Sequence, residues 1–207
     1  MEAARSQVLQ QLSSGDFNSL VHSCEELELA IQEEPCDAPS PEQDNSLGGL
    51  YALHLLAYLL EGHLCAARFL WKRTPAALQQ HPQVAAAHSV LTARWQRQYA
   101  DFFKQLRAGP WEAQLQPLAN EVLVRSRERM LDEIGEAYEV IAVERLAAML
   151  GAEPAEARAA CCRRSWPVDA AGHASPTKAK VGEDLMQMGE AQLKKLARYV
   201  AYLEQPQ

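Results

Sequence analysis

The most constraining feature of the sequence is a nearly continuous apolar stretch from Leu47 to Trp71. Ala and Leu dominate the chain and β-branched residues are scarce, which favours helix over sheet. Gly62 interrupts the stretch where a helix end accepts a left-handed residue, and Pro75 stops the segment that follows, over about residues 63–73. Two helices joined by so short a turn must lie antiparallel, so the stretch predicts an αα-hairpin.

Further helical segments flank this hairpin. Apolar residues recur at steps of three and four over residues 17–31, which is the period of one buried helix stripe. Residues 83–108 predict one long helix that Gly109-Pro110 ends, and another long helix runs to about Tyr138. Stacked hairpins of this kind are typical of an α-solenoid, although no strict period is visible.

Acidic residues are concentrated in residues 1–50. Ten acids stand there against Arg5 alone, so this part carries −9 of a formal chain charge of −7. Residues 32–46 combine several of these acids with three prolines and predict a flexible acidic surface loop. The simpler interpretation is that these acids lie on a solvated helix face and in the loop. The alternative is that they steer a basic partner toward this part of the chain.

The sequence pattern changes after about residue 138. A short apolar run suited to a strand is followed by two short helical segments and then by a turn at Gly172. The segments are Val140–Val143, Glu144–Leu150 closed by Gly151, Pro154 to about Arg164, and a two-stranded wing within residues 166–178. This order is typical of a winged-helix module, although Pro167 and Pro176 each remove a strand donor.

The last segment predicts a helix from about residue 189 to 204 with a single apolar seam. The seam residues, spaced by seven, three, four and three positions, are Met186, Leu193, Leu196, Val200 and Leu203. Such a stripe packs either onto its own domain or into a bundle with other chains. We therefore treat these five residues as the candidate partner-binding residues.

Charge and composition exclude several classes of protein. A net charge of −7 gives no general grip on nucleic acid, which needs clustered positive charge. The start of the chain lacks the pattern of a signal peptide, and the apolar segment from Leu47 to Leu60 is too short to span a bilayer. The five cysteines form no C-x-x-C pair and predict reduced thiols in the cytoplasm or nucleus.

No pattern predicts catalysis, a metal or a cofactor. The six histidines form no H-E-x-x-H, and no phosphate-binding glycine motif is present. His54, His63 and Cys65 flank one turn but lack an evident fourth ligand. Cys161-Cys162 lies beside two arginines, and nearby positive charge is one way to activate a thiol, yet no histidine is near in sequence. Structural roles are the simpler interpretation of both groups.

DNA binding is the main rival hypothesis. The basic residues of the second helix and wing of the winged-helix segment are Arg158, Arg163, Arg164, Lys178 and Lys180. However, Glu153 and Glu156 stand at the leading end of that helix, where base contacts are usually made. Residues 138–180 hold six basic and five acidic side chains, a sum of +1, which is small for binding phosphates.

Several stretches resemble a family of PCI-type subunits. The stretches begin at Ser19, at Tyr51, at Ala67 (Ala-Arg-Phe-Leu-Trp-Lys-Arg-Thr-Pro), at Trp95 (Trp-Gln-Arg-Gln-Tyr) and at Leu193, and together they span roughly residues 17–205. The family holds the eighth subunit of the COP9 signalosome, the smallest scaffold subunit of the proteasome lid and subunit k of translation initiation factor 3. The stretch at Ala67 is the most specific.

The resemblance implies a mainly α fold: helical-repeat hairpins, a small winged-helix module and a C-terminal helix that joins a bundle with other subunits. The expected parts are an extension (1–15), a helical-repeat domain (16–125), a winged-helix module (126–181) and a terminal helix (182–207). The family implies a non-catalytic scaffold in the complex that removes Nedd8 from cullins, with a neighbour such as subunit 3 paired through the winged helix. It implies no cofactor, no membrane and a place in cytoplasm and nucleus; other PCI complexes remain alternatives.

Overall fold

The computed structural model describes the greater part of the chain, namely residues 6, 8, 10–12, 15, 17, 19–33, 41–177 and 197, with residues 32, 33 and 41–45 described by backbone alone. Its elements are α2 (Leu20–Glu33), α3 (Pro41–Glu61), α4 (Leu64–Arg73), α5 (Ala76–Gln79), α6 (Pro82–Trp95), α7 (Tyr99–Ala108), α8 (Gln116–Ala137), β1 (Ile141–Ala142), α9 (Val143–Leu150), α10 (Pro154–Arg163) and β2 (His173–Ala174). The predicted mainly α fold is confirmed.

Helices α2 to α7 and the first half of α8 share one core and are termed the helical arm. Helix α3 is its centre. It packs against α2, α4, α6 and α8, so that every residue from Tyr51 to Leu60 is buried. A helix that is apolar on all sides requires such a position, because no face of it can be left to water. The predicted hairpin with α4 is present, and Gly62 has the expected left-handed conformation, with φ of 83°.

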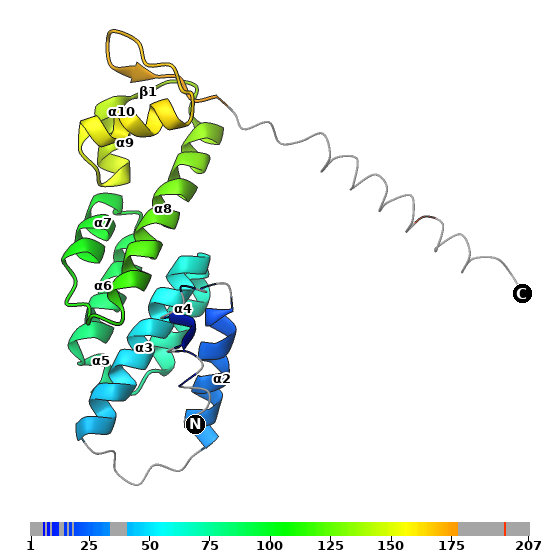
Figure 1. The fold of residues 1–207 in the computed structure, drawn as a ribbon, viewed down its shortest axis with the longest axis vertical. Coiled ribbons are helices and arrows are strands. Elements are labelled where there is room, and N and C mark those ends of the chain that lie inside the picture. The colour runs from blue at the N-terminus through cyan, green and yellow to red at the C-terminus, as the bar shows by residue number, and fades with distance from the viewer. Residues whose placement is uncertain are drawn as a thin grey trace, which may run out of the picture.

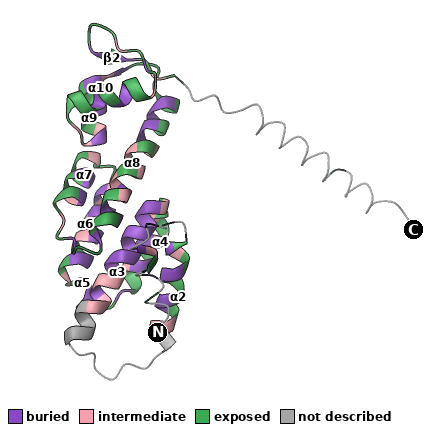
Figure 2. Ribbon diagram, viewed as in Figure 1, coloured by how far each residue is buried: buried purple, intermediate pink, exposed green. Residues whose placement is uncertain are grey.

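Helix α8 joins the arm to a second module, which consists of α9, α10, β1 and β2 (Figure 1). Its first half packs Leu118, Ala119 and Val122 into the core of the arm. Its second half packs Met130 and Ile134 into a separate core shared with α9, α10 and β2. Figure 2 shows buried residues on the inner sides of the arm helices and again in the second module. The expected boundary between residues 125 and 126 therefore falls within one continuous helix.

The expected loop over residues 32–46 was wrong at both ends. Helix α2 continues to Glu33, and α3 begins at Pro41. Proline is favourable in the first turn of a helix because the N–H that it lacks has no partner there. The prolines and acids of this segment therefore indicated the start of a helix as well as a connection.

The single long helix expected over residues 83–108 was also wrong. Helix α6 ends at Trp95 and α7 begins at Tyr99, with Arg97 left-handed at φ of 58° between them. The Gln98 N–H reaches back to the Ala93 carbonyl at 2.9 Å and closes the end of α6. No Gly or Pro marks this turn, so the sequence pattern did not indicate it.

Candidate interaction site

The second module contains a small sheet. Strand β1 pairs antiparallel with β2, so that Ile141 lies opposite Ala174 and Ala142 opposite His173. On the other side of β2, Val168 forms a bridge with Ala174. Strand β2 is therefore central, and β1 is an edge strand among the described residues. An edge strand exposes backbone donors and acceptors to which another chain can add.

Two apolar side chains stand beside this edge. Tyr138, the residue after α8, is 37% exposed, and Val140, directly before β1, is 57% exposed. The sequence predicted a strand over Val140–Val143, but the strand is confined to the middle two residues. Val143 instead begins α9 and is fully buried in the module's core. The edge position of β1 and the exposed side chains just before it suit a protein partner.

The wing is shorter than the sequence indicated. Within the residues 166–178 expected to form it, Val168 makes a single bridge to Ala174, and β2 comprises only His173 and Ala174. The turn before it is held by Asp169, whose carboxylate accepts the His173 N–H at 2.7 Å. This hydrogen bond holds the pKa of Asp169 below its usual value. Backbone pairing reaches Ser175, whose N–H donates to the Pro167 carbonyl at 2.9 Å, and Pro176 has no N–H to extend it further.

The basic helix α10 does not present all its arginines outward. Arg158 and Arg163 are exposed, but the Arg164 guanidinium pairs with the Asp132 carboxylate and donates to the Glu128 carbonyl of α8 at 3.3 Å. The predicted Lys178 and Lys180 lie outside the described residues. The structure thus uses one of the three helix arginines to hold α10 on α8, which weakens the DNA-binding hypothesis.

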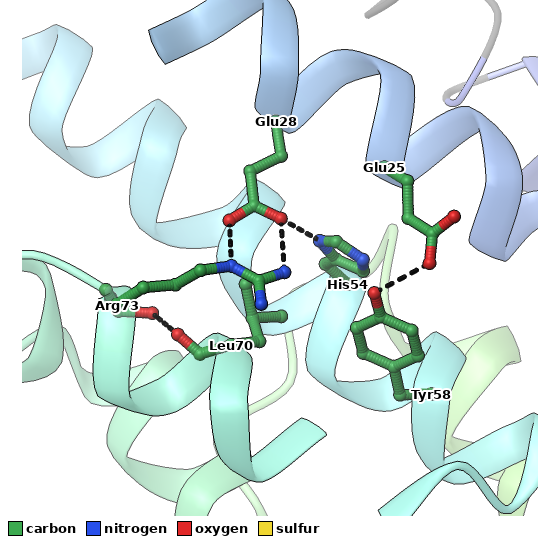
Figure 3. A network of polar contacts seen from close by, with 7 residues as sticks. Glu25, Glu28, His54, Tyr58, Leu70 and Arg73 are labelled. Carbon is green, nitrogen blue, oxygen red and sulfur yellow. Dashed lines mark hydrogen bonds and ion pairs between the residues drawn. The ribbon is translucent and has the colours of Figure 1, made fainter. Parts of the chain in front are cut away.

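A polar network fastens α2 to the hairpin of α3 and α4 (Figure 3). The Glu28 carboxylate is buried and accepts two hydrogen bonds from Arg73, at 2.5 and 2.7 Å. Its Oε2 atom also lies 3.7 Å from Nδ1 of His54, which is itself buried and stacks on Tyr58. The Tyr58 hydroxyl donates to Glu25 at 2.8 Å.

The electrostatics of this network follow from burial and pairing. Burial lowers the pKa of His54 to about 4, although Glu28 opposes the shift, so the imidazole is neutral at physiological pH. Hydrogen bonds from Arg73 to Glu28 raise the pKa of Arg73. Burial and the hydrogen bond to Glu25 raise the pKa of Tyr58 to about 12. Glu25, Glu28, His54, Tyr58 and Arg73 together form a structural clasp between α2 and the hairpin of α3 and α4. They do not form an acid–base pair open to a substrate.

The candidate chemical groups of the sequence are not assembled into a reactive site. His54 is buried in the clasp, whereas His63 and Cys65 are exposed at the start of α4. Cys161 is buried and its pKa is raised, the opposite of an activated thiol. Within the described residues no three His, Cys, Asp or Glu side chains are placed to hold a metal ion. No helix in that part of the chain is long and apolar enough to cross a bilayer.

The five candidate partner-binding residues lie outside the described residues. Met186, Leu193, Leu196, Val200 and Leu203 therefore stay a prediction from spacing. Sequence reasoning placed Val140 within the expected strand and did not identify Tyr138 and Val140 as exposed positions before β1. Of the tryptophans, Trp111 is buried, whereas Trp95 is 43% exposed.

A helical arm joined through one long helix to a small second module is a mainly α architecture of the PCI type. Comparison with known proteins gives the family. The model of the CSN8/PSMD8/EIF3K family matches residues 47–183, and the chain belongs to this family.

Three relatives illustrate the similarity, and each is a COP9 signalosome complex subunit 8. The protein from Xenopus laevis is 31% identical over 93% of this chain and 94% of its own length. The protein from Arabidopsis thaliana is 27% identical over 96% of this chain and 98% of its own length. The protein from Drosophila melanogaster is 29% identical over 75% of this chain and 85% of its own length. The resemblance noted in the sequence is thus confirmed.

Proposed function

We propose that this chain is the eighth subunit of a COP9 signalosome and acts there as a non-catalytic scaffold. One observation carries the proposal: relatives named as that subunit align with nearly the whole chain, from the arm to the terminal segment. The activity of the complex, removal of Nedd8 from cullins, then resides in another subunit. The chain contributes surfaces for assembly, in the cytoplasm and in the nucleus.

Assembly uses two surfaces at the carboxy-terminal side of the arm. The edge of β1, with Tyr138 and Val140, pairs with the winged helix of a neighbouring PCI subunit, with subunit 3 as the expected partner. The terminal seam joins a helical bundle with the remaining subunits. Burial of four or five seam side chains provides about 1.5–3 kcal/mol each before ordering costs are subtracted. The exposure of Val140 and the edge position of β1 in the described sheet support the first contact.

The terminal helix is tested by Leu196→Asp combined with Leu203→Asp. The variant is co-expressed with the other subunits and the complex is purified through a tag on a different subunit. We expect the variant to be lost from the complex while its circular dichroism stays close to that of the wild type. A matched control, Leu29→Asp with Val124→Asp, places the same charges at exposed apolar positions of the arm. Stoichiometric recovery of the seam variant would remove the terminal helix as an anchor.

The identity of the complex is tested separately by affinity purification and mass spectrometry. Recovery of signalosome subunits together with their metalloprotease supports the proposal. Recovery of proteasome-lid or initiation-factor subunits instead would assign the chain to another branch of its family. DNA binding of submicromolar affinity at physiological salt, lost in Arg158→Glu with Arg163→Glu, would support the rival hypothesis.

A further inference from the structure

The outward face of α4 combines aromatic and cationic side chains that the fold does not use. Arg68, Phe69 and Lys72 project from this face, and Trp95 approaches it from the end of α6; these four residues are termed the α4 patch. Phe69 is 60% exposed and Trp95 is 43% exposed. Single exposed apolar residues are ordinary on protein surfaces, but two large aromatic rings beside two cations form a surface with a defined chemistry.

The rest of α4 holds this patch in a fixed position. Ala67 and Leu70, on the opposite side of the helix, are completely buried in the core of the arm. Trp71 stacks on His88 of α6, with ring centroids 3.7 Å apart and an angle of 9° between the planes. Helix α4 is therefore anchored to both its neighbours, and the patch is a preformed surface that need not be ordered when a partner binds.

Within the patch, the cations lie over the aromatic rings. The Arg68 guanidinium carbon is 4.0 Å from the centroid of the Trp95 ring, and the Lys72 Nζ is 5.7 Å from the centroid of Phe69. Cation–π contacts at exposed positions stabilise such an arrangement modestly. They leave the hydrogen-bond donors of both cations available, because an aromatic face accepts no conventional hydrogen bond from them.

The charge of Arg68 and Lys72 decides what the patch can bind. In the part of the chain that the structure describes, no carboxylate forms an ion pair with Arg68 or Lys72. The next cation of the same helix, Arg73, differs because it pairs with Glu28. The patch is thus a positive, aromatic surface on a chain whose net charge is −7.

We propose that the α4 patch binds an acidic segment of a partner protein, with carboxylates paired to Arg68 and Lys72 and an apolar side chain against Phe69 and Trp95. Charge complementarity selects the acids, and the two exposed rings select the apolar residue. Two cations are too few to hold a nucleic acid by its phosphates alone. The proposal adds a third contact surface, on the arm, to the edge of β1 and the terminal seam, and it does not depend on which complex the chain joins.

The probe is a fluorescein-labelled synthetic peptide of ten residues, Gly-Asp-Glu-Phe-Glu-Asp-Leu-Asp-Glu-Gly, titrated by fluorescence anisotropy with the full chain. We expect saturable binding in the submillimolar range at low salt that weakens as salt is raised. A peptide with Lys at every acidic position should not bind. A peptide with Ser in place of Phe and Leu should bind at least about fivefold more weakly, because one buried apolar side chain is worth that much or more.

The protein variant Arg68→Glu with Lys72→Glu should bind the peptide about tenfold more weakly, because two attractive pairs become repulsive. The control variant Lys104→Glu with Arg145→Glu makes the same change in net charge at two exposed cations elsewhere and should bind as the wild type does. Phe69→Ser, at a position that is 60% exposed, separates the apolar contribution from the charges. Unchanged thermal unfolding shows that each variant is folded.

Three outcomes would overturn the proposal. The first is no binding by the wild type, or equal weakening by the patch and control variants. The second is a wild-type dimer in sedimentation that the patch variant abolishes, since the occupant would then be a second copy. The third is tighter peptide binding after Glu34→Gln, Asp37→Asn, Glu42→Gln and Asp44→Asn. That result would make the chain's own acidic segment the occupant.

Discussion

Glu28 is the residue that most strongly ties α2 to the arm. Its carboxylate is buried, and Arg73 compensates for the loss of water with two hydrogen bonds from its guanidinium group. Charge-assisted bonds of this geometry are strong, and a buried carboxylate without its cation is costly. The attachment of α2 therefore depends on a cation that stands 45 positions later in the chain.

We expect Arg73→Met to lower the free energy of unfolding by about 2 kcal/mol, because it leaves the Glu28 carboxylate buried without its cation. The Arg73 side chain is 42% exposed, so the loss in free energy of unfolding is smaller than for a fully buried ion pair. Urea unfolding followed by circular dichroism measures the change. The double variant with Glu28→Gln should lose less than the sum of the single variants, and Lys104→Met, at an exposed site, should change little. Additive losses would contradict the pairing.

His54 makes stability depend on pH. Its pKa falls from 6.5 to about 4 on folding, because burial between α2 and α3 outweighs the attraction of Glu28. The unfolded chain therefore binds the proton first as pH falls, and stability decreases from about pH 6.5 down to about pH 4. The loss due to this residue reaches about 3 kcal/mol at the acid end.

His54→Gln tests this dependence, since an amide of similar size does not titrate. Chemical denaturation at intervals between pH 4 and pH 7.5 should show a shallower slope for the variant than for the wild type below pH 6.5. Glu25, Glu28, Tyr58 and Arg73 face the ring in both proteins, so their contributions cancel in the difference. If both proteins lost stability in parallel as pH falls, the His54 imidazole would bind its proton as readily in the folded state as in the unfolded state.

The sequence indicated the buried face of each helix better than the partners of its polar residues. Arg73 is exposed along much of its side chain, as Lys72 is, yet its guanidinium group also pairs with Glu28 of α2. Periodicity identifies which side of one helix is buried. It carries no information on which residues of distant helices meet, so neither the pair of Glu28 with Arg73 nor the burial of His54 could be predicted.

At the scale of elements, the contact of α7 with α9 depends on Gly151. This residue ends α9 in the left-handed conformation, with φ of 54°, and a Cβ atom placed there would overlap Phe103 of α7. We expect Gly151→Ala to lower the free energy of unfolding by about 2 kcal/mol, from backbone strain and the clash together. At Gly62, also left-handed, a Cβ would meet only the end of the flexible Arg129 side chain. Gly62→Ala should therefore cost about 1 kcal/mol, and equal losses in thermal unfolding would contradict the clash.

The ends of helices could be predicted from the sequence where a glycine or a proline fixes them. Gly62, Gly151 and Pro154 marked helix ends that the structure has. The break at Arg97 was not predictable, because an arginine rarely adopts the left-handed conformation and its neighbours Gln96 and Gln98 are equally compatible with a helix. The wing was indicated in outline only, since strands of two residues leave no alternation to detect.

At the scale of the whole molecule, the arm and the second module are joined by the continuous helix α8 and by the contact of α7 with α9. The Arg127 side chain donates to the carbonyls of Leu150 and Gly151 at 3.1 and 3.2 Å, and so satisfies the end of α9. Its guanidinium also lies over the ring of Phe103, 5.7 Å from the centroid. One side chain thus connects α7, α8 and α9, beside a continuous helix that belongs to both cores.

We expect Arg127→Met to loosen the second module without loosening the arm. The two carbonyls at the end of α9 lose their donor, at a cost of about 1–2 kcal/mol, so amide exchange in α9 and α10 should accelerate about tenfold. Exchange in α3 and α4 should not change, and hydrogen–deuterium exchange read by mass spectrometry compares the regions in one sample. Arg125→Met is the matched control, because Arg125 pairs with Glu121 of its own helix. If exchange in α3 rose as much as in α9, the two cores would open as a single unit, and α8 would transmit a loss in the module to the whole arm.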